Sequence, residues 1–416
     1  MMLAKIVFLT ASLLLAAMLP GGPAQAAANP AFKAWLAQLW PQAEQMGVSR
    51  RTFDSVTRTL EPNFSLPDLI IPGRPEHDEP GQPEFVRTPA DYLSEKSLAR
   101  LAVYGRELAE QHRDVLAVIE KRFGVPATMV LAIWGRETDF GRYKVQHNAL
   151  AALATQAYAG RRKEQFLPEF LHALKMVDDG YIKPADFAAS WAGATGMTQF
   201  LPSEYYKYAV DLDGDGRANI WGSVPDALAS AAKQLAGKGW QNGKRWAYEV
   251  RVPESVDCTI AEPDHTMALG EWLKRGYQPV FNRQPTPAEL ADETSLLLPA
   301  GSYGPAFLIS KNYFVIKDYN FSDLYVLFVG SLHDRMKEGR GFETKWGTVS
   351  QLHTRELQEM QVRLTELGFY RDKVDGKAGM KTRSALGAYQ KKHNLKLDCW
   401  PTMTVLSHMR RKFGQR

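Results

Sequence analysis

Apolar side chains recur three and four residues apart along most of this chain, the spacing that places them on one face of a helix. Alternation typical of strands is confined to short pieces near residues 248–252 and 296–298. The pattern therefore predicts a mainly α (α+β) fold. The expected helices cover residues 30–60, 92–123, 125–142, 147–159, 166–179, 225–238, 268–275, 322–335, 354–367, 382–393 and 402 onward.

Two breaks in this pattern divide the chain. Residues 61–89 carry seven prolines, which predicts an extended segment rather than a regular element. Residues 341–353 lie in a glycine-containing, polar stretch typical of a linker. We therefore expect one large domain at 27–340, a linker at 341–353, and a compact three-helix domain at 354–416.

The segment VPATMVLAIWGRETDFGR contains the strongest candidate for chemistry. Its apolar stripe predicts a helix that faces a core, and Glu137 lies on that stripe near Gly135, which leaves space beside it. A carboxyl sheltered in this way is expected to have a raised pKa, as a general acid requires. Asp139 points to another side of the helix, so the two carboxyls are not a catalytic pair. The alternative is a structural glutamate at a helix end, held by Arg136, Arg142 or another arginine.

Composition narrows the class of protein only modestly. A hydrophobic content of 45%, a charged content of 23% and a formal net charge of +5 are ordinary for a globular protein. Lysines and arginines crowd residues 371–416, which predicts contact with an anionic surface or simply a solvated basic face. The chain has neither the ligand spacing of a zinc site nor a G-x-S-x-G nucleophile motif.

Residues 1–26 have the pattern of a secretory signal peptide, with a short basic start, an apolar run and an Ala-Gln-Ala cleavage site. The apolar run is too short for a stable membrane span, so we expect an exported, soluble protein without a transmembrane anchor. The two cysteines are Cys258 and Cys399. Export permits a bridge between them, but isolated cysteines also stay free or buried, and the sequence does not decide between these states.

Two other segments carry polar residues that could bind a ligand. Gln199 lies among apolar residues in a glycine-flanked turn, which suits either a polar ligand or a structural turn. Arg161 and Arg162 are adjacent, so they could pair with a carboxylate or remain solvated.

The acidic loop at 211–226 resembles the start of a calcium-binding loop. Asp211, Asp213 and Asp215 stand at alternate positions. The twelfth position, where such loops carry a bidentate glutamate, is a glycine, and Asp226 is the acid that could replace it. By itself this pattern fits a calcium site and an Asp/Gly turn about equally.

Taken in order, these segments resemble the lytic murein transglycosylases of the membrane-bound transglycosylase B type. GVPATMVLAIWGRETDFG is similar to the catalytic helix of that family, which makes Glu137 the single catalytic acid/base. SWAGATGMTQFLPSEYYKYAVDLDGDGRANIWGSVPDA and NYFVIKDYN resemble two further blocks. The resemblance implies a lysozyme-like helical catalytic domain with small β elements. It also implies substrate-binding roles for Ser190, Gln199, Asn312, Tyr319, Tyr313, Arg161 and Arg162.

The same resemblance bears on metal binding. It implies that the acidic loop is an EF-hand-like site for a structural calcium ion, with no cofactor required for the chemistry. The implied ligands are Asp211, Asp213, Asp215, the Arg217 carbonyl and Asp226.

The C-terminal part resembles the peptidoglycan-binding domain 1 family through residues 357–370, the VDG at 374–376 and TRSALGAYQ. This chain departs from the two families in two respects. The membrane-bound namesake is a lipoprotein, whereas the anchoring cysteine is missing here. Asp398-Cys399-Trp400 also stands where such binding domains carry a second glycine-rich turn.

The resemblance implies cleavage of the MurNAc-β-1,4-GlcNAc bond of peptidoglycan without water, giving 1,6-anhydromuramyl products for periplasmic cell-wall remodelling or recycling. Glu137 would act first as the acid and then as the base, with Tyr319 orienting it or the reacting carbon. The expected partners are glycan strands and cell-wall synthesis proteins, with no nucleic acid. A hydrolytic muramidase and a non-catalytic wall-binding scaffold are the alternatives.

Overall fold

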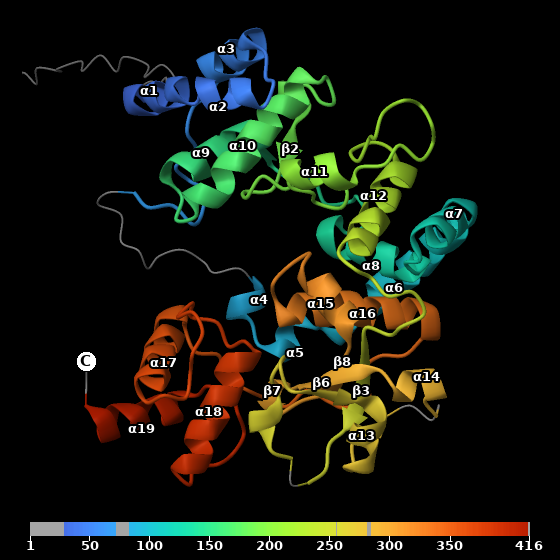
Figure 1. The fold of residues 1–416 in the computed structure, drawn as a ribbon, viewed down its shortest axis with the longest axis vertical. Coiled ribbons are helices and arrows are strands. Elements are labelled where there is room, and N and C mark those ends of the chain that lie inside the picture. The colour runs from blue at the N-terminus through green and yellow to red at the C-terminus, as the bar shows by residue number, and fades with distance from the viewer. Residues whose placement is uncertain (1–28, 72–82, 255, 281–283, 415–416) are drawn as a thin grey trace, which may run out of the picture.

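The computed structural model describes residues 29–71, 83–254, 256–280 and 284–414 (Figure 1). The expected signal peptide at 1–26 lies outside the described residues. The mainly helical expectation is confirmed, although several expected helices are divided in two or three. The helices are α1 (Pro30–Gln38), α2 (Trp40–Gln45), α3 (Arg50–Thr59), α4 (Pro83–Val86), α5 (Pro89–Tyr92), α6 (Glu95–Gln111), α7 (Arg113–Phe123), α8 (Ala127–Thr138), α9 (Ala149–Ala159), α10 (Lys163–Asp178), α11 (Pro202–Tyr208), α12 (Val224–Gly237), α13 (Leu269–Lys274), α14 (Pro287–Leu290), α15 (Lys311–Lys317), α16 (Asp323–Glu338), α17 (Thr354–Glu366), α18 (Met380–Lys392) and α19 (Met403–Phe413).

Helix α8 is the centre of the largest hydrophobic core. It begins after Pro126 and ends where Asp139 and Phe140 adopt positive φ angles of 49° and 58°. Eight of its twelve residues are buried, because α6, α7, α12 and α16 pack around it. The space expected beside Gly135 is filled, since a Cβ atom there would lie 2.6 Å from the Phe140 ring. Glycine is therefore required at this position by close packing and not by a vacancy.

A second core lies in what we call the N-terminal lobe, which comprises α1–α3, α9, α10 and the loop that follows them. Buried side chains from α1, α3, α9 and α10 meet there, including Phe32, Phe53 and Phe170. The proline-rich segment packs against this lobe. Leu69 is buried and forms an antiparallel β-bridge with Gly160, directly after α9. In Figure 1 the N-terminal lobe lies at the top, on one side of α8 and α16.

A five-stranded antiparallel sheet lies on the other side of α16 (Figure 1). Its order is β4 (Thr266–Ala268), β6 (Glu293–Leu297), β8 (Ala306–Ile309), β3 (Ala247–Arg251) and β5 (Gln278–Pro279). The two strand-like pieces expected from alternation belong to β3 and β6, whereas the other strands were too short to show a pattern. A further strand β7 (Pro299–Ser302) follows β6, and β1 (His147–Asn148) pairs with β2 (Ala188–Ala189) near the N-terminal lobe.

The C-terminal unit, residues 354–414, is built from α17, α18 and α19 around its own core of Leu357, Met360, Leu386 and Leu406. The segment at 341–353, expected to be a linker, is attached to the sheet. The buried Glu249 carboxylate on β3 accepts hydrogen bonds from the Glu343 and Thr344 amides at 3.1 and 2.8 Å. The connection is therefore fixed along the sheet.

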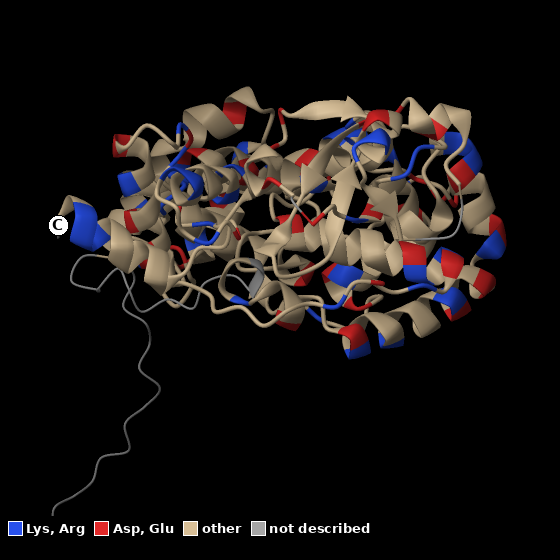
Figure 2. Ribbon diagram, turned by 90° about the horizontal axis from the view of Figure 1, so that it is seen from below, with Lys and Arg blue, Asp and Glu red and all other residues tan. Residues whose placement is uncertain are grey.

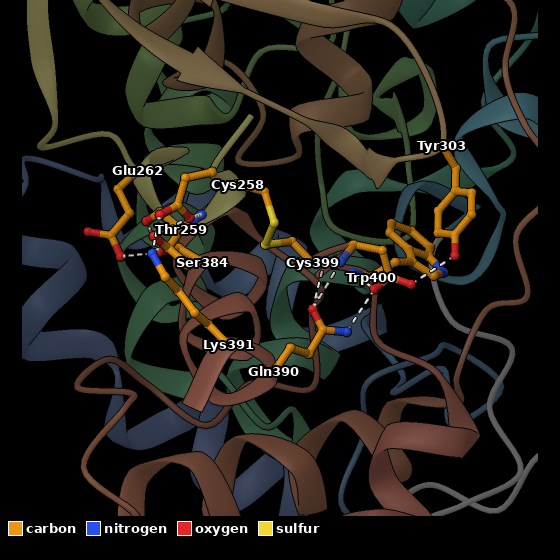
Figure 3. Close-up of a disulfide and its surroundings, with 11 residues drawn as sticks. Cys258, Thr259, Glu262, Tyr303, Ser384, Gln390, Lys391, Cys399 and Trp400 are labelled. Atoms are coloured by element: carbon orange, nitrogen blue, oxygen red, sulfur yellow. Dashed lines mark hydrogen bonds and ion pairs between the residues drawn. A yellow bond between two sulfur atoms is a disulfide. The ribbon is translucent and has the colours of Figure 1, made fainter. Parts of the chain in front are cut away.

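A disulfide joins Cys258 to Cys399, which lie 141 residues apart, and settles the question that the sequence left open. It connects the segment after β3 to the loop between α18 and α19, and both cysteines are buried. Around it the Ser384 hydroxyl donates to the Thr259 carbonyl and the Glu262 carboxylate, each at 2.6 Å (Figure 3). The C-terminal unit is thus docked against the rest of the protein and not merely tethered to it.

Charge is distributed unevenly between these parts. Residues 354–416 contain 14 lysines and arginines but six acids, so the C-terminal unit carries the net positive charge of the chain. Figure 2 shows basic residues at the end of α19 beside the C-terminus, where Arg410, Arg411 and Lys412 form its last turn. Among the described helices, none has both the length and the apolar character needed to cross a bilayer.

Removing the disulfide should weaken the docking of the C-terminal unit. We expect a Cys258→Ser/Cys399→Ser variant to fold but to lose about 2–4 kcal/mol of unfolding free energy, because the unfolded chain is no longer closed into a long loop. The measurement is a thermal melt of both proteins without reductant. Adding reductant to the double variant is the control and should change nothing. Equal melting temperatures for the variant and the wild type would contradict the expectation.

Candidate active site

Glu137 lies in the last turn of α8, where the helix emerges from the core and its side chain is half-buried. Its Oε1 atom accepts a hydrogen bond from the Tyr325 hydroxyl. Tyr325 comes from the first turns of α16 and is 1% exposed. Helices α8 and α16 therefore meet at the carboxylate, through two residues that are 188 positions apart in sequence. The raised pKa expected for Glu137 stays a prediction.

A second tyrosine completes one wall of the site. The rings of Tyr319 and Tyr325 stack with centroids 6.4 Å apart and an interplanar angle of 11°. The Tyr319 hydroxyl donates to the Thr198 carbonyl at 2.5 Å. Burial, and next the charge of Glu137, raise the pKa of both tyrosines well above the ordinary value, so both remain donors at neutral pH.

The role expected for Tyr319, orienting the acid or the reacting carbon, stays a prediction. In the structure the Tyr325 hydroxyl donates to the acid, whereas the Tyr319 hydroxyl donates to the carbonyl of residue 198 and its ring stacks on Tyr325. Sequence reasoning missed Tyr325, although a signal was present. A buried tyrosine in the apolar run DLYVLFVG needs a hydrogen-bond partner for its hydroxyl.

The two arginines named as structural partners of Glu137 also bind other groups. Arg136 donates to the Tyr92 hydroxyl through Nε at 3.1 Å, and its guanidinium lies 5.7 Å from the centre of the Tyr325 ring. Burial opposes the charge of Arg136, but the nearby hydroxyl of Tyr92 and the carboxylate of Glu137 raise its pKa overall. Arg142 pairs with Asp139 at 2.8 Å. The expectation that Asp139 points away from Glu137 stays a prediction.

The loop that contains Gln199 is fastened beside α8. Thr138, the neighbour of Glu137, donates its hydroxyl to the Met197 carbonyl at 2.7 Å. Gln199 has a φ angle of 54°, is half-buried, and donates from Nε2 to the Gly196 carbonyl at 2.9 Å. A non-glycine residue held in this strained region is a feature that often accompanies function. Ser190, at the start of the same loop, accepts from the Ala192 and Ala194 amides at 3.3 and 3.2 Å.

The site lies at the border between two cores. Met197 and Tyr319 each pack against both the core around α8 and the core of the N-terminal lobe. Two hydrogen bonds cross this border: the Thr138 hydroxyl donates to the Met197 carbonyl, and the Tyr319 hydroxyl donates to the Thr198 carbonyl. They hold the 190–200 loop next to the end of α8, where Glu137 lies. This juxtaposition joins residues that the sequence places in separate blocks.

Two expected site residues lie elsewhere, and these expectations are corrected. Asn312 is fully buried, and its amide group exchanges hydrogen bonds with the Gln241 and Lys244 backbone at 2.7–2.9 Å. Tyr313 is also fully buried and donates to Asp323 at 2.7 Å. Both side chains are occupied in holding α15, so neither faces Glu137.

Arg161 and Arg162 are exposed and share one intramolecular partner. Arg162 approaches Asp68 at 2.8 Å, and Arg161 lies 3.7 Å from it. The sequence left carboxylate pairing and solvation open, and the structure gives pairing. Arg162 also lies 5.8 Å from the Trp191 ring, next to Ser190, so it stays close to the loop of the site.

The acidic loop gathers three of its expected ligands. Carboxylate oxygens of Asp211, Asp213 and Asp226 lie within 4.8 Å of one another. Asp226 is fully buried at the start of α12 and accepts from the Leu212 and Asn219 amides, each at 2.8 Å. This set of hard oxygen donors fits a calcium ion.

The other two expected ligands, Asp215 and the Arg217 carbonyl, are not part of this group of carboxylates. Asp215 is exposed, is not one of the grouped carboxylates, and accepts from the Arg217 amide at 2.8 Å. A role for the Arg217 carbonyl stays a prediction. The loop therefore fits the metal with part of the ligand set that the resemblance implies.

Chemically, Glu137 offers a carboxyl that can give and take a proton. It is placed at the end of a rigid helix, held by a tyrosine that stays protonated, and bordered by backbone carbonyls and an amide side chain. Such a group suits general acid–base catalysis on a polar, uncharged bond.

Comparison with known proteins agrees with this geometry. The family model described as "Transglycosylase SLT domain" matches residues 31–334, and a peptidoglycan binding domain model matches residues 354–405. Membrane-bound lytic murein transglycosylase B of Escherichia coli (strain K12) is 39% identical over 138 residues. That stretch is 33% of this chain and spans 38% of the relative's own length.

Two solved structures are similar in fold. SltB3 from Pseudomonas aeruginosa, in complex with NAG-NAM-pentapeptide, matches with a TM-score of 0.81 and 38% identity over 91% of this chain and 99% of that chain. Escherichia coli Slt35, in complex with calcium, matches with a TM-score of 0.58 and 25% identity over 75% of this chain and 94% of that chain. Since the first family model covers well over half of the sequence, this chain belongs to the transglycosylase SLT domain family.

Proposed function

We propose that this protein is a peptidoglycan lytic transglycosylase, which cleaves the MurNAc-β-1,4-GlcNAc bond and leaves a 1,6-anhydromuramyl end. The observation that carries the proposal is the half-buried Glu137, held by Tyr325 at the end of α8. Membership of the transglycosylase SLT domain family, and similarity to SltB3 bound to NAG-NAM-pentapeptide, support the same substrate class.

The chemistry needs a single carboxyl because the substrate supplies the attacking oxygen. Protonated Glu137 donates its proton to the glycosidic oxygen, and the bond from that oxygen to the muramyl anomeric carbon breaks. The resulting carboxylate then takes the proton of the muramyl 6-hydroxyl as this oxygen bonds to the anomeric carbon. Glu137 thus gives up one proton and regains one, so it ends in its starting state, and no water enters the products.

The surroundings of Glu137 favour this route over hydrolysis. Most glycosidases that use water position a second carboxylate opposite the acid. The next acid in sequence, Asp139, pairs with Arg142. Neutral tyrosine donors beside Glu137 therefore support internal attack by the sugar.

Substrate contacts are proposed for the residues that border the acid. Gln199 and Ser190 lie on the loop fastened to α8 and would hydrogen-bond sugar hydroxyls and amides. Tyr319 would contribute its ring to the wall of the site. Arg161 and Arg162, exposed near Trp191, would meet the carboxylates of the peptide stem or of the lactyl groups.

Location and wall attachment follow from the same substrate. The protein would act in the periplasm, after export directed by residues 1–26, and the C-terminal unit would bind the cell wall through its peptidoglycan binding domain match. Cell-wall synthesis proteins are proposed as recruiting partners. Asp211, Asp213 and Asp226 would hold a calcium ion whose role is to fix the loop before α12.

The central test is a Glu137→Gln variant. The amide keeps the shape of the side chain but cannot exchange the proton, so the rate of wall cleavage should fall by about 10²–10⁴-fold while fold and sacculus binding persist. The measurement is mass spectrometry of soluble products released from purified sacculi. Wild-type protein should release anhydromuropeptides.

Three outcomes would contradict the proposal. Products one water heavier would identify a hydrolytic muramidase, and the absence of soluble product from the wild type would identify a wall-binding scaffold. Near wild-type turnover by Glu137→Gln would remove this residue from the mechanism.

A Tyr325→Phe variant tests how the acid is oriented. Loss of one hydrogen bond to a charged group should lower kcat by about 10- to 100-fold, with little change in apparent KM, because the carboxyl loses its fixed direction. Tyr248→Phe is the matched control, since that hydroxyl binds Asp292 beside the sheet. Equal activities of Tyr325→Phe and the control would show that Tyr325 has no part in orienting Glu137.

Calcium binding is tested by the melting temperature. If the acidic loop holds the ion, excess chelator should lower the melting temperature by several degrees, because the folded state loses a ligand that the unfolded chain does not bind. An Asp213→Asn variant should lose this response, whereas Asp186→Asn, an exposed acid outside the loop, should keep it. Superimposed melting curves and no bound metal would identify a plain turn.

A further inference from the structure

A buried cluster of charges links the C-terminal unit to the helix that carries Tyr325. Arg383 on α18 donates from Nη2 to the Oδ2 atom of Asp323 at 3.0 Å. Both side chains are almost completely buried, at 6% and 8% exposure. Asp323 is the first residue of α16, so the contact joins two domains through the start of one helix.

Asp323 also binds the preceding helix α15. Its Oδ1 atom accepts from the Tyr313 hydroxyl at 2.7 Å and from the Lys317 ammonium at 2.5 Å. Burial by itself would raise the pKa of Asp323, but Lys317 and Arg383 outweigh it and hold the pKa well below its usual range. The carboxylate is therefore charged in the folded protein and depends on both cations.

The tyrosine that holds the acid, Tyr325, lies on the far side of the same helical turn. Tyr325 follows Asp323 by two residues, which corresponds to a rotation of about 200° around a helix. Asp323 thus faces the C-terminal unit while Tyr325 faces Glu137. The first turn of α16 is held between a charge pair on one side and the acid on the other.

The second tyrosine of the site is connected to the same cluster. Helix α15, which carries Tyr313 and Lys317, leads directly to Tyr319, and the Tyr319 ring stacks on Tyr325. The position of α15 relative to α16 is set by the bonds that Asp323 accepts from both sides. Any shift of Asp323 would therefore move both tyrosines.

We propose that Arg383 is a positioning residue for the reaction: through Asp323 it fixes the first turn of α16 and thereby the direction in which Tyr325 holds Glu137. This inference rests on the proposed transglycosylase function. It means that the C-terminal unit contributes a side chain to the geometry of catalysis, in addition to any binding of the cell wall.

The other contacts of the C-terminal unit make this proposal testable. The C-terminal unit is also attached to residues 258–262, between β3 and β4 (Figure 3). These attachments are the Cys258–Cys399 disulfide and the hydrogen bonds of Ser384 to Thr259 and Glu262, and none of them involves α16. They keep the unit docked when Arg383 is replaced. A substitution at 383 therefore changes the charge cluster without releasing the domain.

The experiment compares Arg383→Met with wild-type full-length protein. Methionine keeps much of the volume but leaves Asp323 with Lys317 as its remaining cation. We expect kcat for anhydromuropeptide release from sacculi to fall by about 10- to 100-fold, with apparent KM changed by less than about twofold, because the acid is misdirected while sugar contacts persist. Sacculus sedimentation should show unchanged wall binding.

Two further variants separate positioning from general damage. Arg383→Lys keeps the charge and should recover part of the lost kcat. Lys391→Gln removes another ion pair of the C-terminal unit, the exposed 2.6 Å contact with Asp257, and should leave kcat unchanged. A loss of kcat in Lys391→Gln equal to that in Arg383→Met would overturn the proposal.

Hydrogen–deuterium exchange gives a readout that does not need activity. In Arg383→Met the amides of residues 322–327 should exchange about tenfold faster, because the start of α16 opens more often, while those of α17 should not change. Unchanged exchange at 322–327, or wild-type kcat in Arg383→Met, would refute the inference. If the wild type releases no anhydromuropeptide, the proposed function fails, and the exchange result still decides whether Arg383 fixes α16.

Discussion

One hydrogen bond, from the Tyr325 hydroxyl to the Glu137 carboxylate, depends on almost every layer of this structure. Glu137 can meet Tyr325 because the middle of α8 is buried, whereas Glu137, in the last turn, is only half-buried. Tyr325 can meet Glu137 because α16 packs along α8 and begins at a residue that is fixed by charges. The single proton donor proposed here needs this degree of restraint, since misdirection of an acid lowers the rate steeply.

Parts of the protein far from Glu137 also help to fix α16 and therefore Tyr325. The disulfide packs beside the sheet, the 341–353 segment lies along β3, and Arg383 of α18 binds the start of α16. A buried ion pair is often no better for stability than an apolar contact, because desolvation offsets the attraction. Its directional character is what an apolar contact lacks. The value of the Asp323 cluster therefore lies in specifying one orientation.

Sequence reasoning worked where a signal was local and failed where it depended on distant partners. The helical stripe of α8 and the place of Glu137 on it could be predicted, since both follow from spacing within eighteen residues. That Tyr325 reaches the acid could not be predicted, because this contact depends on how α16 packs against α8. Asn312 was misplaced for the same reason: its backbone partners lie about seventy residues earlier. The disulfide and the docked linker likewise depend on contacts that no spacing rule contains.

The fixed attachment of the C-terminal unit sets the reach of the molecule. A domain on a flexible tether could cut anywhere within a sphere around its anchor, with the radius given by the length of the tether. Here the C-terminal unit and Glu137 are parts of one body, locked by a disulfide and a buried charge pair. If the C-terminal unit binds the wall as proposed, the acid is therefore held at one distance and one angle from the bound strand.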